Sequence, residues 1–173
     1  MNSDGSMPGK LWKLRQDIHL VHYSKEPLLG VRQGQQMGSL NDSFKPAGLW
    51  FSVDGYPNDM TWPRWCQAED FHVDCLQAGT EIVLTADHRV LHLSTKDEIR
   101  QFQARFRRDA VPKDHLRVID WAGVAEKFQG IIIAPYCFDA RFEDGMLWYY
   151  TWDCASGCIG DPAAIESPCP AMF

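Results

Sequence analysis

The chain has 173 residues, and 17 lysines and arginines against 23 aspartates and glutamates give it a formal net charge of −6. Hydrophobic residues make up 45% of the sequence and charged residues 23%, a balance that indicates a folded globular protein and excludes a wholly disordered or fibrous chain. No stretch of about 18 apolar residues occurs, so no transmembrane helix and no membrane partner are expected. The negative charge also argues against sequence-independent coating of nucleic acid.

Composition divides the chain into three parts. Residues 1–10 are rich in serine, glycine and proline and lack the apolar core of a signal peptide, so we expect a flexible leader or a tag remnant there. Residues 11–160 are expected to form one domain, and the proline-rich segment 161–173 a loosely packed tail. Without a signal peptide we expect a cytoplasmic protein, whose six cysteines stay free thiols because that compartment is reducing.

In chain order, the first predicted elements are two strands joined by a long loop. Residues 18–22 form a short apolar run and residues 48–53 a run of aromatic and branched residues, both typical of strands. Residues 30–47 between them are rich in glycine, glutamine, serine and asparagine and show no hydrophobic period, which predicts a loop. Long loops within a compact domain tend to be functional, so we expect this one to act as a lid.

Start signals predict three helices further along the chain. Pro63 suits a first helical position, Thr95 and Glu98 have capping-box spacing, and Asp120 is a typical N-cap for a helix that stops before Gly130. The first of these helices would present four residues along one face, namely Trp65, Ala68, His72 and Cys75. The remaining strands are expected at 81–84, 89–93, 131–134 and 147–152.

Polar residues at the ends of apolar strands mark the candidate site. They occur in His22-Tyr23-Ser24, in Trp50-Phe51-Ser52 and in the segment 152–158. Each stretch combines aromatic rings with hydrogen-bonding groups, a mixture suited to binding a flat heterocycle together with a sugar. The alternative is that His22 is a core histidine with a backbone partner and that the aromatic residues only pack.

The order of these stretches resembles the ADP-ribosyltransferase superfamily, in the histidine–aromatic–acid branch of diphtheria toxin and the poly(ADP-ribose) polymerases. The segment Leu20-Val21-His22-Tyr23-Ser24 is similar to the opening Leu-x-His-Gly-Ser/Thr strand, with Tyr23 in place of glycine. The segment Gly48-Leu49-Trp50-Phe51-Ser52 is similar to the Gly-Ile/Leu-Tyr-Phe-Ser/Ala strand. The resemblance covers residues 18–153 and implies an α+β domain with a strongly curved, mostly antiparallel split sheet and two or three flanking helices.

The resemblance also implies a reaction, in which NAD is a consumed substrate and ADP-ribose passes to a macromolecular acceptor, protein or nucleic acid. Asp153 would stabilise the oxocarbenium-like ribose, although the family typically has glutamate there. His22 would hold a ribose hydroxyl, and Ser24 or Ser52 would fix the carboxamide or the ribose edge. The aromatic residues implied in NAD binding are Tyr23, Trp50, Trp62 and Trp65.

Other interpretations stay open at this stage. Asp153 could simply cap a turn, in which case Glu81 and Glu69 are the reserve acids. A cysteine-dependent hydrolase would pair Cys154 or Cys158 with His22 or His92. A metal-stabilised binding module would use Cys154, Cys158, His72 and Cys75, but these residues form no recognised zinc pattern, so we expect no metal. The protein could also be an inactive ADP-ribosyltransferase-like binding or inhibitor protein.

One basic segment of the sequence is a candidate binding surface for the acceptor. Its cations are Arg100, Arg105, Arg107, Arg108, Lys113 and Arg117. These residues are either the solvated outer side of a helix and its following loop, or a landing surface for nucleic acid or an acidic protein. No aromatic stacking pattern accompanies the strip, so it does not predict base stacking.

Overall fold

The computed structural model describes residues 7–30, 44–109 and 117–170. Within these residues the principal strands are β1 (Lys10–Leu11), β2 (His19–Ser24), β3 (Leu49–Asp54), β4 (Ala78–Leu84), β5 (Val90–Leu93), β8 (Gly130–Ile133), β9 (Ser156–Ile159) and β10 (Ile165–Pro170). They form one continuous sheet in the order β1-β5-β8-β9-β3-β2-β4-β10, in which β5 and β8 are the parallel pair and the other neighbours are antiparallel. The strands β6 (Arg107–Asp109) and β7 (Arg117–Ile119) pair separately.

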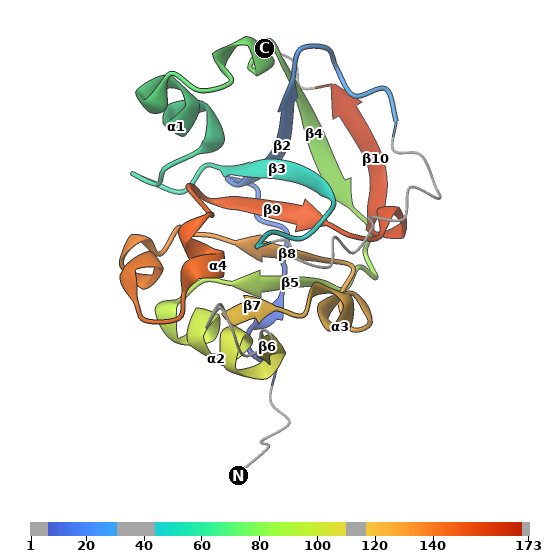
Figure 1. Ribbon diagram of the computed structural model, residues 1–173. Helices are drawn as coiled ribbons and strands as arrows, with labels where there is room; N and C mark the ends of the chain where they lie inside the picture. Colours follow the sequence, from blue (N-terminus) through green and yellow to red (C-terminus); the bar gives the residue numbers. More distant parts are fainter. Residues whose placement is uncertain (1–6, 31–43, 110–116, 171–173) are drawn as a thin grey trace.

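The sheet is strongly curled. In Figure 1, β5, β8 and β9 run across the view, whereas β2, β4 and β10 run steeply along it. The expected α+β class with a curved, mostly antiparallel sheet is therefore confirmed, although the eight strands are hydrogen-bonded into one continuous sheet. None of the helices in the described ranges is both long enough and apolar enough to cross a membrane.

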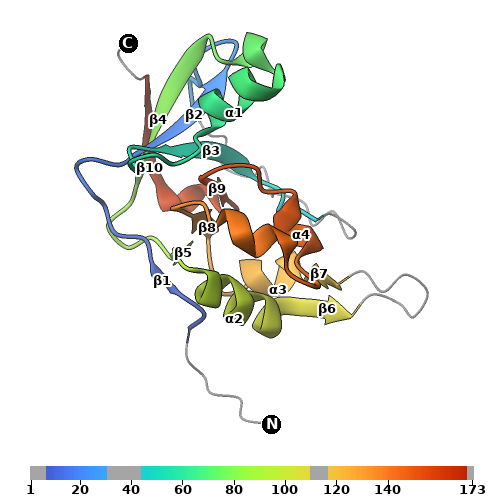
Figure 2. The same cartoon turned by 90° about the vertical axis from the view of Figure 1, so that its left-hand side faces the viewer.

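Four α-helices occur in the described part of the chain, with three 3-10 turns. The α-helices are α1 (Trp62–Glu69), α2 (Lys96–Phe106), α3 (Trp121–Ala125) and α4 (Leu147–Tyr150), and the turns are η1 (Val73–Cys75), η2 (Phe138–Phe142) and η3 (Pro162–Ala164). Figures 1 and 2 show α2, α3 and α4 gathered at the β5–β8 half of the sheet, while α1 lies at the other half, near β2 and β4.

Alternation along the central strands divides the core between the two faces of the sheet. Leu91, Leu93, Ile131 and Ile133 pack in the cluster that contains α2, α3 and α4. The intervening Ile132 is also fully buried, but it belongs to the cluster on the opposite face. Successive strand side chains point to opposite faces, and both faces of β5 and β8 are covered, which explains why every residue of these strands is buried and why most are apolar.

The helix start signals are confirmed where they are local. The Thr95 hydroxyl accepts the Glu98 backbone N–H at 3.2 Å, and the Glu98 carboxylate accepts the Thr95 backbone N–H at 3.1 Å, which completes the capping box. Asp120 caps α3 through the Gly123 backbone N–H. The expected four-residue stripe on the first helix is wrong, because α1 ends at Glu69 and Asp70 adopts a left-handed φ of 50°.

Two expected segments take a different structure. Residues 147–152 were expected as a strand, but 147–150 form the helical turn α4, which buries Trp148 and Tyr149 and leaves Tyr150 exposed. The segment 161–173, expected as a loosely packed tail, contains β10, which pairs with β4 from Ile165 to Pro170. Of the expected leader at 1–10, residues 1–6 lie outside the described residues, and Lys10 begins β1. Most of the expected lid, residues 31–43, also lies outside the described residues.

Candidate functional site

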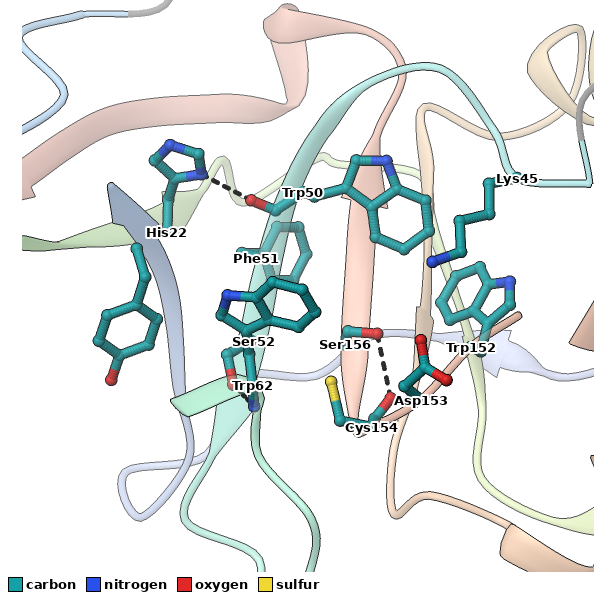
Figure 3. Close-up of a pocket in the computed structure, with 11 residues that line it drawn as sticks. His22, Lys45, Trp50, Phe51, Ser52, Trp62, Trp152, Asp153, Cys154 and Ser156 are labelled. Atoms are coloured by element: carbon teal, nitrogen blue, oxygen red, sulfur yellow. Dashed lines mark hydrogen bonds between the residues drawn. The ribbon is translucent and has the colours of Figure 1, made fainter. Parts of the chain in front are cut away.

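A cavity of about 280 Å³ lies where β2, β3 and the start of β9 meet (Figure 3). Six of the residues expected in the site line it: His22, Tyr23, Trp50, Ser52, Trp62 and Asp153. Cys154, considered from the sequence as a nucleophile or metal ligand, also lines it. The remaining lining residues were not predicted as site residues, namely Lys45, Phe51, Trp152 and Ser156. The convergence follows from the strand order, because β2 and β9 are both hydrogen-bonded neighbours of β3.

His22 is held in one orientation by the neighbouring strand. Its Nδ1 lies 2.7 Å from the backbone carbonyl oxygen of Trp50. A carbonyl oxygen can only accept, so Nδ1 carries the proton and donates, and Nε2 of the neutral ring remains an acceptor. The histidine therefore has the backbone partner of the packing interpretation, and at the same time it lines the cavity.

Asp54 organises the hydroxyl groups of this wall. The Tyr23 hydroxyl donates to one Asp54 carboxylate oxygen at 2.7 Å, and the Ser52 hydroxyl donates to the other at 2.5 Å. The Ser52 oxygen also accepts the backbone N–H of Trp62 at 3.0 Å, which fastens the start of α1 to β3. Burial first, and the Asp54 carboxylate second, raise the pKa of Tyr23, so this hydroxyl stays protonated.

Burial and two nearby positive charges have opposite effects on the pKa of Asp153. It follows α4, and its carboxylate lies 3.7 Å from the guanidinium of Arg141. Burial is the largest influence and raises the pKa of Asp153, whereas the charges of Lys45 and Arg141 lower it. Figure 3 shows the Lys45 side chain reaching toward Asp153, and its Nζ lies 5.4 Å from the ring centroid of Trp50. The two positive charges offset the burial only in part, so the pKa of Asp153 is raised overall.

Arg141 is enclosed by aromatic rings. Its guanidinium carbon lies 4.5 Å from the ring centroid of Tyr150, 5.5 Å from that of Phe138 and 5.7 Å from that of Phe142. It also donates to the backbone carbonyl oxygen of Tyr150 at 3.1 Å. Cation–π contacts of this kind fix a guanidinium in place. Arg141 was not predicted as a site residue, although its position among the aromatic residues of 136–150 is a signal that could have indicated it.

Stacked indoles form another wall of the cavity. Trp62 and Trp65 lie with ring centroids 5.3 Å apart and an interplanar angle of 19°, and the edge of Phe71 packs against both. Trp62 lines the cavity and Trp65 supports it from behind, so Trp65 is outside the site as described. Ser24 is also outside the cavity lining, and its hydroxyl donates to the Glu26 backbone carbonyl oxygen.

The reserve acids do not reach the cavity lining. Glu81 on β4 accepts a hydrogen bond from His19 at 2.9 Å and is half-exposed. Glu69 ends α1, and its negative charge acts with burial to raise the pKa of Asp153. Asp153 is therefore the acid of this cavity among the three carboxylates considered.

The thiols do not have the environment of a nucleophile. Cys154 lines the cavity, but burial raises its pKa to about 12, and burial also raises the pKa of Cys158. A reactive cysteine needs a lowered pKa, because the thiolate is the attacking species. His92 donates to the Ala134 backbone carbonyl oxygen and does not line this cavity. The hydrogen bonds found for His22 and His92 in the described residues go to backbone carbonyl oxygens and not to Cys154 or Cys158.

The basic segment is partly described. Arg100 donates to both Glu143 carboxylate oxygens, at 2.7 and 2.6 Å, and to Asp97 at 2.8 Å. It is therefore engaged in ion pairs on the outer side of α2, as the solvated-face interpretation predicts. Lys113 lies outside the described residues.

Comparison with known proteins finds no matching family model, no similar curated protein and no similar solved structure. The functional assignment therefore rests on the cavity and on the residues that line it.

Proposed function

We propose that this protein is an NAD-dependent ADP-ribosyltransferase with an ADP-ribosyltransferase-like fold. It would cleave the bond between nicotinamide and ribose and transfer ADP-ribose to a macromolecular acceptor, protein or nucleic acid. The observation that supports this most is that His22, Ser52 and Asp153, which are far apart in the chain, converge on one cavity lined with indole rings. An imidazole, an acid and stacking rings are what the resemblance in the sequence implies around one ribose.

The size of the cavity suits one half of the dinucleotide. At about 280 Å³ it lies just below the range of pockets for drug-sized molecules, about 300–1,000 Å³, which supports binding of nicotinamide with its ribose and not of the whole of NAD. Trp62, supported by Trp65, offers a flat face for the nicotinamide ring. The adenylate half would then extend beyond the described lining.

The reaction needs charge stabilisation more than covalent help. As the glycosidic bond breaks, its electron pair leaves with nicotinamide and the ribose carbon becomes oxocarbenium-like. The Asp153 carboxylate would face this developing positive charge and take the proton of the attacking acceptor group. Such a preorganised group contributes about 3 kcal/mol. His22 would accept a hydrogen bond from a ribose hydroxyl at Nε2, because Nδ1 is committed to Trp50.

Incubation with NAD labelled on the adenylate side tests this proposal. The wild-type chain should release nicotinamide and attach label to an acceptor in a mixture of proteins and nucleic acids. Asp153→Asn and His22→Ala should each lower nicotinamide release by about 100-fold, on the scale of lost electrostatic stabilisation. Glu81→Gln is the matched control, since this acid lies outside the cavity lining, and it should keep wild-type activity. Full activity in both site variants would refute the site.

A second candidate function is binding without transfer. It is favoured by one observation: Tyr23, which replaces the motif's glycine, lines the cavity and is tied to Asp54. Equilibrium binding of NAD without release of nicotinamide, abolished by Trp62→Ala, would support a binding or inhibitor protein instead.

A further inference from the structure

Three potential metal ligands meet on the connection between α1 and β4, away from the cavity. His72, Asp74 and Cys75 each direct one ligand atom to a common point, and these atoms lie within 4.8 Å of one another. The Cys75 sulfur is 3.9 Å from Nδ1 of His72 and 3.7 Å from Oδ1 of Asp74. A left-handed φ of 51° at His72, just before η1, turns the imidazole back toward the thiol.

These separations are close to those of a bound ion. Zinc binds sulfur, nitrogen and oxygen at about 2.0–2.3 Å in tetrahedral geometry, so ligand atoms on one zinc ion lie roughly 3.3–3.8 Å apart. The two separations from the Cys75 sulfur are already within a few tenths of an ångström of this range, and the third, between His72 and Asp74, lies within 4.8 Å, so side-chain rotation of about an ångström would bring all three atoms onto one ion. Mixed sulfur, nitrogen and oxygen donors select zinc-like ions over magnesium or calcium, which prefer oxygen alone.

An ion pair with Lys25 orients the Asp74 carboxylate toward the Cys75 sulfur. The Lys25 ammonium pairs with Oδ2 of Asp74 at 2.5 Å, so the opposite oxygen, Oδ1, faces the Cys75 sulfur. Cys75 is only half-buried, and its sulfur lies between the His72 imidazole and the Asp74 carboxylate, so an ion arriving from solvent can reach it.

We propose that His72, Asp74 and Cys75 bind one zinc-class divalent cation, with a fourth coordination position open to water. The site differs from the metal module considered from the sequence, because Cys154 and Cys158 are not part of it. It is independent of the proposed transferase activity. The site is also linked to the aromatic residues behind the cavity. The His72 ring packs on Phe71 with ring centroids 4.1 Å apart, and Phe71 packs on Trp65. A bound ion would brace the indole stack behind the cavity.

Titration of the chelator-treated full chain with Zn²⁺ tests the proposal. The wild type should bind one ion per chain, and His72→Ala and Cys75→Ser should each weaken binding by about tenfold or more, the scale on which metal sites respond to lost support. Cys137→Ser is the matched control, because this half-buried thiol lies at η2 and should leave binding unchanged. With Co²⁺ as the probe, the wild type should show a thiolate-to-cobalt absorption band that Cys75→Ser lacks.

Folding is checked by circular dichroism of each variant. If Cys75→Ser unfolds, Asp74→Asn decides, because it keeps the side-chain shape and removes the charge. Binding that is absent in the wild type, or equal in the wild type, His72→Ala and Asp74→Asn, would overturn the proposal.

Discussion

The guanidinium of Arg141 lies 3.7 Å from the carboxylate of Asp153, inside a cage of three aromatic rings. Its positive charge opposes the burial that raises the pKa of Asp153. In Arg141→Met this opposition is lost, so the pKa of Asp153 should rise further and a larger fraction of the acid should be protonated at any given pH. The acidic limb of the pH–rate profile for nicotinamide release should therefore move to higher pH. Arg89 donates to the Lys127 backbone carbonyl oxygen and does not line the cavity, so Arg89→Met should leave the limb in place. An unmoved limb in Arg141→Met would show that the pair does not tune the acid.

The capping box of α2 predicts a measurable loss of stability. Thr95→Ala removes the hydroxyl that accepts the Glu98 backbone N–H. The free energy of unfolding should fall by about 1 kcal/mol, the usual cost of losing such a cap. Denaturant titration measures it, with Thr95→Ser as a control that keeps the hydroxyl. Equal losses in both variants would mean that the methyl group, and not the cap, carries the effect.

Glu143 should contribute stability that depends on pH. Hydrogen bonds from Arg100 and then Lys96 lower the pKa of Glu143 to about 2, from an ordinary value of 4.5. A lowered pKa in the folded state stabilises the protein fully above the unfolded value and progressively less as pH falls toward the folded value. Between pH 4.5 and 2 the wild type should therefore lose more stability than Glu143→Gln. Denaturant titrations across this range measure the slope, with Glu126→Gln at the end of α3 as the control.

Gly157 marks a close approach in the centre of the sheet. A Cβ atom there would lie 2.4 Å from the Phe51 ring and 2.9 Å from the Ile131 carbonyl oxygen. Gly157→Ala should therefore force β3 or β8 to shift and lower the free energy of unfolding by about 1–3 kcal/mol. Gly30→Ala is the matched control, because a Cβ at Gly30 meets nothing within 4 Å. Thermal unfolding of the two variants measures the difference.

Signals that are local in sequence predicted local structure. The Thr95–Glu98 box and the Asp120 cap depend on contacts within four residues, and both form as expected. The strand predicted at 147–152 was wrong because a short apolar run is equally compatible with a strand and with a buried helical turn. There, Trp148 donates to Gln103 on α2 at 2.8 Å and packs on Phe102, so tertiary contacts decide the conformation.

The elements that sequence reasoning overlooked have compositions unlike those of typical strands. β9 has the sequence Ser-Gly-Cys-Ile, whose small residues indicate a loop, yet it lies between β3 and β8 where the close approach at Gly157 requires them. The prolines of β10 indicate a tail, since proline removes a backbone donor. In both cases the neighbouring strands, and not local preference, set the structure.

The candidate site was predicted in part. His22, Ser52 and Asp153 were expected to meet and do line one cavity. The contributions of Lys45, Asp54 and Arg141 were missed, because each acts through a charge or hydrogen bond to a residue distant in the sequence. Such pairings depend on the strand order β9-β3-β2, which a single sequence does not reveal.

The two margins of the eight-stranded sheet offer little for another molecule to pair with. β1 has only two residues, and β10 at the opposite margin contains Pro168 and Pro170, which have no N–H to donate. Short or proline-bearing outer strands hinder the growth of a sheet from one molecule into the next. The arrangement thus disfavours cross-β aggregation, even though the central strands β5 and β8 are mostly apolar.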